Sequence, residues 1–130
     1  MSIFAGIDLG TSGIKVALAD EAGTCLASAA RPSAVDTPHP GWSQQDPEEW
    51  WRLTAEIFDE LAATQPRLMA RLDAISLSGH MLGQVLIDAE DRPTTPCILW
   101  NDQRAIAECA ELLARVPDIG RRTNGQPDPG

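Results

Sequence analysis

The segment that decides the fold is Gly6-Ile7-Asp8-Leu9-Gly10-Thr11-Ser12-Gly13-Ile14-Lys15. Apolar residues alternate with small or polar ones on both sides of a Gly-Thr-Ser-Gly tetrapeptide, which is the pattern of a β-hairpin. A third strand is expected over residues 24–30, after a turn at residues 20–23. The sequence therefore predicts three antiparallel strands before the first helix.

The tetrapeptide at the tip of this hairpin also has the composition of an anion-binding turn. Its two glycines let the backbone approach a ligand closely, and its two hydroxyl groups add donors to the backbone amides. Asp8 ends the first strand, where a carboxylate can hold Mg²⁺ through water. The candidate phosphate-binding residues are Gly10, Thr11, Ser12, Gly13 and Lys15. The residues alone leave an ordinary turn open as the alternative, because glycine and serine dominate turns for steric reasons.

One long helix is predicted after an extended, proline-containing loop at residues 31–41. Asp46 is placed to cap it by accepting from the N–H of Glu49, and Pro47 suits its first turn. The helix should end before Pro66. Its apolar stripe consists of Trp50, Leu53, Ile57 and Leu61.

The second half of the chain is predicted to hold short strands and one more helix. The strands are expected at residues 74–78, 85–88 and 96–100. A helix is expected to begin at Asp102, to carry apolar residues spaced for burial and to stop at Pro117, and residues 120–130 show no obvious element. This order predicts an α/β layer in which the strand after the first helix adds in parallel.

Composition excludes several classes of function. Ten basic residues against nineteen acidic ones give a net charge of −9, which would repel nucleic acid and anionic membranes. No apolar run reaches the roughly 18 residues needed to span a bilayer, and the first residues lack the basic start of a secretory signal. We therefore expect a cytoplasmic protein, and we interpret Cys25, Cys97 and Cys109 as reduced structural thiols.

Four segments make the chain resemble the FGGY carbohydrate kinases, which belong to the ribonuclease H-like superfamily with actin, hexokinase and Hsp70. They are residues 6–15, the approach to the helix at residues 41–51, the Gly-bounded loop within residues 76–83, and residues 98–104. In the last of these, Leu99-Trp100-Asn101-Asp102-Gln103-Arg104 resembles the Leu-Trp-Asn-Asp-x-Arg segment of the xylulokinase branch.

The resemblance implies an actin-like ATPase layer in which a three-stranded antiparallel meander, a parallel strand and flanking helices form an incomplete domain. It implies the N-terminal part, residues 1–130, of the first domain of an ATP-dependent sugar kinase that uses Mg²⁺ and phosphorylates a ketopentose such as xylulose or a related polyol. Asp8 would support Mg²⁺ and the phosphates, whereas the catalytic aspartate and the second, ATP-binding domain would lie beyond this chain. The isolated chain is then expected to be inactive and to self-associate, for example as a dimer, through exposed strand edges.

The same resemblance supplies the substrate-binding candidates, which are His80, Met81, Leu82, Trp100, Asn101, Asp102 and Arg104. The loop Gly-His-Met-Leu-Gly departs from the commoner Gly-Gln-Met-His-Gly, and a leucine cannot donate a hydrogen bond to a sugar hydroxyl. An unpaired hydroxyl would cost about 1–3 kcal/mol, so the identity of the sugar stays open. His80 either reaches the ligand or is a satisfied histidine in a tight turn, and we favour the second interpretation. Asp102 is expected to cap the helix, and Arg104 either pairs with it or faces the sugar.

Two other functions stay open at this point. One is a non-catalytic Hsp70-like or actin-like nucleotide-binding module, and the other is a sugar-binding module that needs no metal. Among the tryptophans, Trp50 is expected in the buried stripe, Trp42 and Trp51 are expected to pack the preceding loop against the helix, and Trp100 is the candidate wall of a site.

Overall fold

The computed structural model describes residues 2–129, and the chain forms two compact units. The first unit contains residues up to Ala34 together with Asp46–His80. The second contains Val35–Gln45 and the residues from Met81 onward.

A four-stranded sheet forms the first unit, with the strand order β3-β2-β1-β5. Its strands are β1 (Ile3–Gly10), β2 (Gly13–Ala19), β3 (Cys25–Pro32) and β5 (Leu72–Ser78). The first three pair antiparallel, and β5 adds to β1 in parallel. Both the hairpin meander and the parallel addition after the helix are confirmed.

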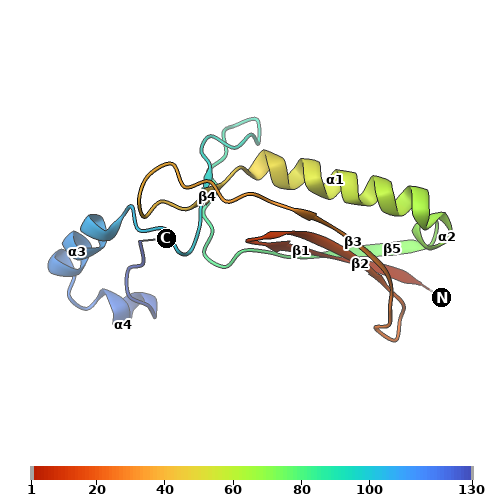
Figure 1. Cartoon of the computed structure of the whole chain (residues 1–130). Helices are drawn as coiled ribbons and strands as arrows, with labels where there is room; N and C mark the ends of the chain where they lie inside the picture. The colour runs from red at the N-terminus through yellow and green to blue at the C-terminus, as the bar shows by residue number, and fades with distance from the viewer. Residues whose placement is uncertain (1, 130) are drawn as a thin grey trace. The chain divides into compact units, whose positions relative to one another are not determined.

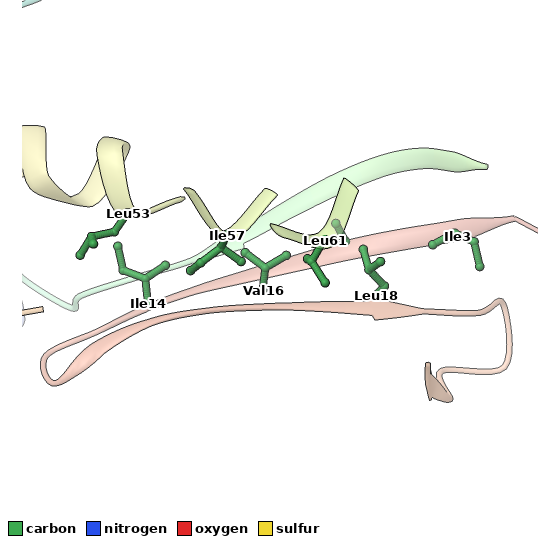
Figure 2. Packing of buried hydrophobic residues seen from close by; sticks show 8 residues of the cluster. Ile3, Ile14, Val16, Leu18, Leu53, Ile57 and Leu61 are labelled. Carbon is green, nitrogen blue, oxygen red and sulfur yellow. The ribbon is translucent and has the colours of Figure 1, made fainter. Parts of the chain in front are cut away.

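Helix α1 (Pro47–Thr64) runs along one face of this sheet, as Figure 1 shows. Its buried side chains Leu53, Ile57 and Leu61 point at apolar residues of the first two strands (Figure 2). The sheet contributes Ile3, Ala5, Ile14, Val16 and Leu18 to the same cluster. Removing this apolar surface from water, at about 25 cal/mol per Å², is the main force that holds helix and sheet together.

The start and the end of α1 follow from local residues. Asp46 is the N-cap, but its carboxylate accepts from the N–H of Glu48 at 3.0 Å instead of from the expected Glu49. Pro47 occupies the first turn, and the helix ends at Thr64, ahead of the proline that opens the short helix α2 (Pro66–Met69).

Strand alternation divides the sheet into two faces. Residues Ile3 and Ala5 of β1 are buried toward α1, so the intervening residues, including Asp8, face the opposite side. Asp8 stands opposite Lys15 of β2 and opposite Ser78 of β5 in the strand register. The sheet therefore presents an acid, a base and a hydroxyl next to one another at the end where β1 turns into β2.

The second unit has little regular structure before its helices. Strands β4 (Gln44–Gln45) and β6 (Cys97–Ile98) form a two-stranded antiparallel pair. The strand expected at residues 85–88 is wrong, because that stretch makes only isolated bridges. The Asp88 carboxylate accepts from the N–H groups of Glu90 and Arg92 and closes a tight turn there.

The two C-terminal helices differ from expectation. Helix α3 (Ile106–Arg115) begins four residues later than predicted. None of its residues is buried, whereas its apolar residues were predicted to be buried. Spacing identifies the apolar side of a helix but not whether the same chain supplies a surface to cover it. Helix α4 (Ile119–Thr123) lies where no element was expected. Within residues 2–129, no helix is both long enough and apolar enough to cross a membrane.

Candidate functional site

A hollow of about 380 Å³ lies at the tip of the β1–β2 hairpin. Five of the predicted phosphate-site residues line it, namely Asp8, Gly10, Ser12, Gly13 and Lys15. Thr11 lies in the turn between the strands but is not part of the lining. The remaining lining residues are Ile14, Ala30, Arg31 and Pro32. The structure thus gathers the hairpin residues around one cavity.

Glycine at position 13 is required by the close approach of β3. A Cβ atom there would lie 2.5 Å from the backbone oxygen of Arg31, a separation that no side chain tolerates. The backbone N–H of Ser33 also donates to the Ser12 oxygen at 3.3 Å, so the start of the loop after β3 is tied to the hairpin turn. The sequence analysis explained these glycines by a tight turn and by close approach to a ligand, and it missed the third strand as part of the cavity.

Asp8 lines the hollow, and its side chain is exposed. Among the described residues 2–129, no ion pair involves Asp8. The same part of the chain contains no cluster of three acidic, histidine or cysteine side chains that could hold a metal ion by itself. A divalent cation at Asp8 would therefore need further oxygen ligands from phosphate groups or water.

Arg31 is a residue of this cavity that the sequence analysis did not identify. It stands opposite Ile14 in the register of β2 and β3, and only that register brings it to the hairpin. Its guanidinium donates to the Glu60 carboxylate of α1 at 2.6 Å. Because this charge is already paired, Lys15 is the cation at the hollow that is available to an anion.

His80 is not the satisfied histidine that we favoured from sequence. Its ring lies against Trp50 with the centroids 5.2 Å apart. Its Nε2 atom is buried and has no hydrogen-bond partner among residues 2–129. Burial lowers the pKa of His80, and the nearby negative charge of Asp8 opposes this only in part. The imidazole is therefore neutral at pH 7.

The other residues that were predicted to bind substrate, apart from Asp102 and Arg104, are largely exposed. Met81 is 80% and Leu82 is 72% exposed, and Leu82 adopts a left-handed backbone with φ of 62°. Trp100 is 58% exposed, and Asn101 is exposed as well. These four residues belong to the second unit, whereas His80 belongs to the first.

Asp102 and Arg104 form a buried network inside the second unit. The Asp102 carboxylate accepts from the backbone N–H of Ser43 at 2.6 Å and from that of Arg104 at 2.7 Å. The Arg104 guanidinium donates to both carboxylate oxygens, and it also donates to Gln44 at 2.9 Å. The expected role of Asp102 as helix cap is wrong, since the N-cap of α3 is Ala105. Of the two alternatives for Arg104, pairing with Asp102 is confirmed.

The tryptophans agree with expectation only in part. Trp42 stacks on the Arg104 guanidinium at 3.9 Å from the ring centre and meets His39 edge-on. Trp51 is 75% exposed, so the prediction that it packs the preceding loop against α1 is wrong. Trp50 packs against the core of the first unit, as predicted.

The Asp102 network makes stability depend on acid pH. Burial is the largest influence and raises the pKa of Asp102, but the hydrogen bonds from Arg104 and Ser43 and the Arg104 charge outweigh it and lower the pKa to about 2. Because the ordinary value is 3.8, this stability is complete above pH 3.8 and is lost as the pH falls toward 2. We expect about 2 kcal/mol to disappear over that range in urea unfolding. Asp102→Asn should abolish this part of the pH dependence; an unchanged profile would show that the network does not control it.

Comparison with known proteins agrees with this geometry. The model of the N-terminal domain of the FGGY family of carbohydrate kinases matches residues 3–126. The xylulose kinase of Escherichia coli is 44% identical over 115 residues, which are 88% of this chain and 23% of that protein. A glycerol kinase of Gloeobacter violaceus is 37% identical over 109 residues, covering 83% of this chain and 21% of that protein.

A solved structure gives the same result for the fold. A xyloylose kinase from Brucella ovis superposes with a TM-score of 0.91 at 43% identity, over 98% of this chain and 26% of that one. The chain thus spans about a quarter of the length of the relatives it matches. Because the family model covers nearly all of the chain and the fold agrees throughout, this chain belongs to the FGGY family of carbohydrate kinases.

Proposed function

We propose that this chain is the N-terminal part of the first domain of an ATP-dependent sugar kinase that acts in the cytoplasm on a ketopentose such as xylulose or a related polyol. The observation that carries the proposal is the hollow at the β1–β2 hairpin, where turn residues surround an acid that has no ion pair within residues 2–129. The similarity to xylulose kinases over most of the chain supports the same proposal.

Different groups of the hairpin would bind different parts of a triphosphate and its metal ion. Backbone amides at the turn donate to phosphate oxygens, and Lys15 adds the positive charge. Asp8 would hold Mg²⁺, with phosphate and water supplying the further oxygen ligands that the ion needs. When bound, MgATP supplies the phosphoryl group, and the fixed donors at the turn stabilise the charge that develops on it.

The proposed substrate is a small polyol, and a ketopentose such as xylulose is one such compound. Relatives at similar identity include both xylulose kinases and a glycerol kinase, so similarity alone does not select a pentulose. The exposed Leu82 offers the ligand no hydrogen bond, which leaves recognition of a hydroxyl at this loop to its neighbours.

Isothermal titration with MgATP and, separately, with pentuloses tests the proposal. We expect weak binding of both ligands, because the chain spans about a quarter of the length of the relatives it matches. Nucleotide binding without any sugar binding favours an Hsp70-like or actin-like module. Sugar binding without nucleotide binding favours a sugar-binding module, and binding of neither contradicts the proposal.

Strand β5 is the surface through which we expect copies of this chain to associate. It lies at the edge of the sheet, and its side chains Ile75 and Leu77 are 56% and 63% exposed. Unpaired edge strands with apolar side chains favour strand-to-strand pairing. Light scattering should show a mass above that of the monomer, rising with salt because salt screens the net charge of −9. Leu77→Lys should restore the monomer; a wild-type chain that stays monomeric at high concentration contradicts this expectation.

A further inference from the structure

The buried Nε2 atom of His80 lowers the stability of the chain. Essentially no solvent reaches this nitrogen, and no group within residues 2–129 forms a hydrogen bond with it. A buried polar atom without a partner lowers stability substantially, and such atoms in native proteins call for a reason. Stacking on Trp50 accounts for the place of the ring but not for the unpaired nitrogen.

The position of His80 in the topology provides a reason. The residue follows β5 after a single glycine, and Ser78 at the end of β5 stands opposite Asp8 in β1. The carboxyl ends of adjacent parallel strands are where α/β sheets bind their ligands. His80 thus follows, by two residues, the strand position that stands opposite Asp8, the acid of the proposed phosphate site.

The residues that follow His80 are also in an unfavourable state. Leu82 has a φ of 62°, a left-handed conformation that is strained for a leucine. Met81 and Leu82 expose most of their apolar surface to water. An unpaired nitrogen, a strained backbone and exposed apolar side chains occur within three consecutive residues. The conformation of this loop is therefore one that a ligand can readily displace.

We propose that binding of a polyol draws His80 away from Trp50, and that Nε2 then forms a hydrogen bond with a hydroxyl group of the sugar. This inference rests on the proposed sugar-kinase function and adds to it the residue that replaces the hydrogen bond Leu82 cannot make. A hydroxyl both donates and accepts, so it satisfies Nε2 of a neutral imidazole in either tautomer.

The two histidines of the chain allow a direct test with an internal control. His39 also contacts a tryptophan, Trp42, but it is exposed and lies in the second unit. Long-range ¹H–¹⁵N spectra of the whole chain resolve the ring nitrogens of both histidines. On titration with D-xylulose we expect the His80 Nε2 signal to move and its contact with Trp50 to disappear, while the His39 signals stay in place. His80→Ala should weaken D-xylulose binding about tenfold, and His39→Ala should not change it.

Three results would overturn the proposal, and they can be told apart. If D-xylulose shifts the amides of the loop but not His80 Nε2, sugar binding stands and the role of His80 is wrong. If only MgATP moves His80, the partner is a phosphate. If D-xylulose shifts no amide even at saturation, the sugar half of the proposed function fails as well.

A further variant tests the unpaired nitrogen without any ligand. His80→Phe keeps an aromatic ring against Trp50 and removes the nitrogen. The equilibrium constant for unfolding of the free chain should fall about fivefold or more, and the D-xylulose response of the loop should weaken. His39→Phe, the matched control, should leave both unchanged. A His80→Phe chain that is no more stable than the wild type contradicts the claim that the free state is poised to rearrange.

Discussion

Asparagine in place of Asp8 is expected to lower the affinity for MgATP about tenfold to a hundredfold, which corresponds to about 1.4–2.7 kcal/mol. The substitution keeps the size of the side chain and removes the charge that orients the divalent cation. The fold should be unaffected, because Asp8 is exposed and is in no ion pair within residues 2–129. Calorimetric titration with MgATP, and with ATP in the presence of a chelator, separates the contribution of the metal.

Asp73→Asn is the matched control for this experiment. Asp73 is an exposed acid in β5 of the same sheet and does not line the hollow. The control removes the same charge, so it accounts for any general electrostatic effect on a triphosphate. Equal affinities of the Asp8 and Asp73 variants would show that Asp8 does not hold the metal.

Asp102→Ala is expected to destabilise the chain by about 3–5 kcal/mol. The substitution leaves the Arg104 guanidinium, 20% exposed, without its counter-charge and leaves the Ser43 N–H without its acceptor. This network links the strand pair of the second unit to the segment before α3. Urea unfolding followed by circular dichroism measures the loss.

Glu111→Ala provides the comparison for that loss. Glu111 pairs with Arg115 on the surface of α3, where both side chains are mostly exposed. Such a pair contributes at most about 1 kcal/mol. If both variants lose the same small amount, the Asp102 network is not a main determinant of stability in this unit.

The hairpin and the first long helix could be predicted because their signals are local. Strand alternation around the Gly-Thr-Ser-Gly turn, and Asp46 followed by Pro47 ahead of an apolar stripe, each specify an element without reference to the rest of the chain. The parallel position of β5 followed from the order of the elements. These features were sufficient to place Asp8 at the end of the hairpin.

The second unit was predicted less well because its structure depends on contacts between residues far apart in sequence. Asp102 has the residue type and position of a helix cap, yet its carboxylate binds Ser43, 59 residues earlier. The orphaned nitrogen of His80 likewise could not be inferred from a glycine-bounded loop, because the burial of one atom depends on the packing of Trp50. The contribution of Arg31 to the hollow required the register of β3, which no local pattern fixes.

The most direct test is to map the site of MgATP binding from backbone amide shifts of the ¹⁵N-labelled chain. If the hairpin turn binds the phosphates, the largest shifts fall on the amides of residues 10–13, and Asp8→Asn diminishes them. Shifts that leave these amides unchanged, or that concentrate on the second unit, would contradict a phosphate-binding role for the hairpin and with it the kinase proposal.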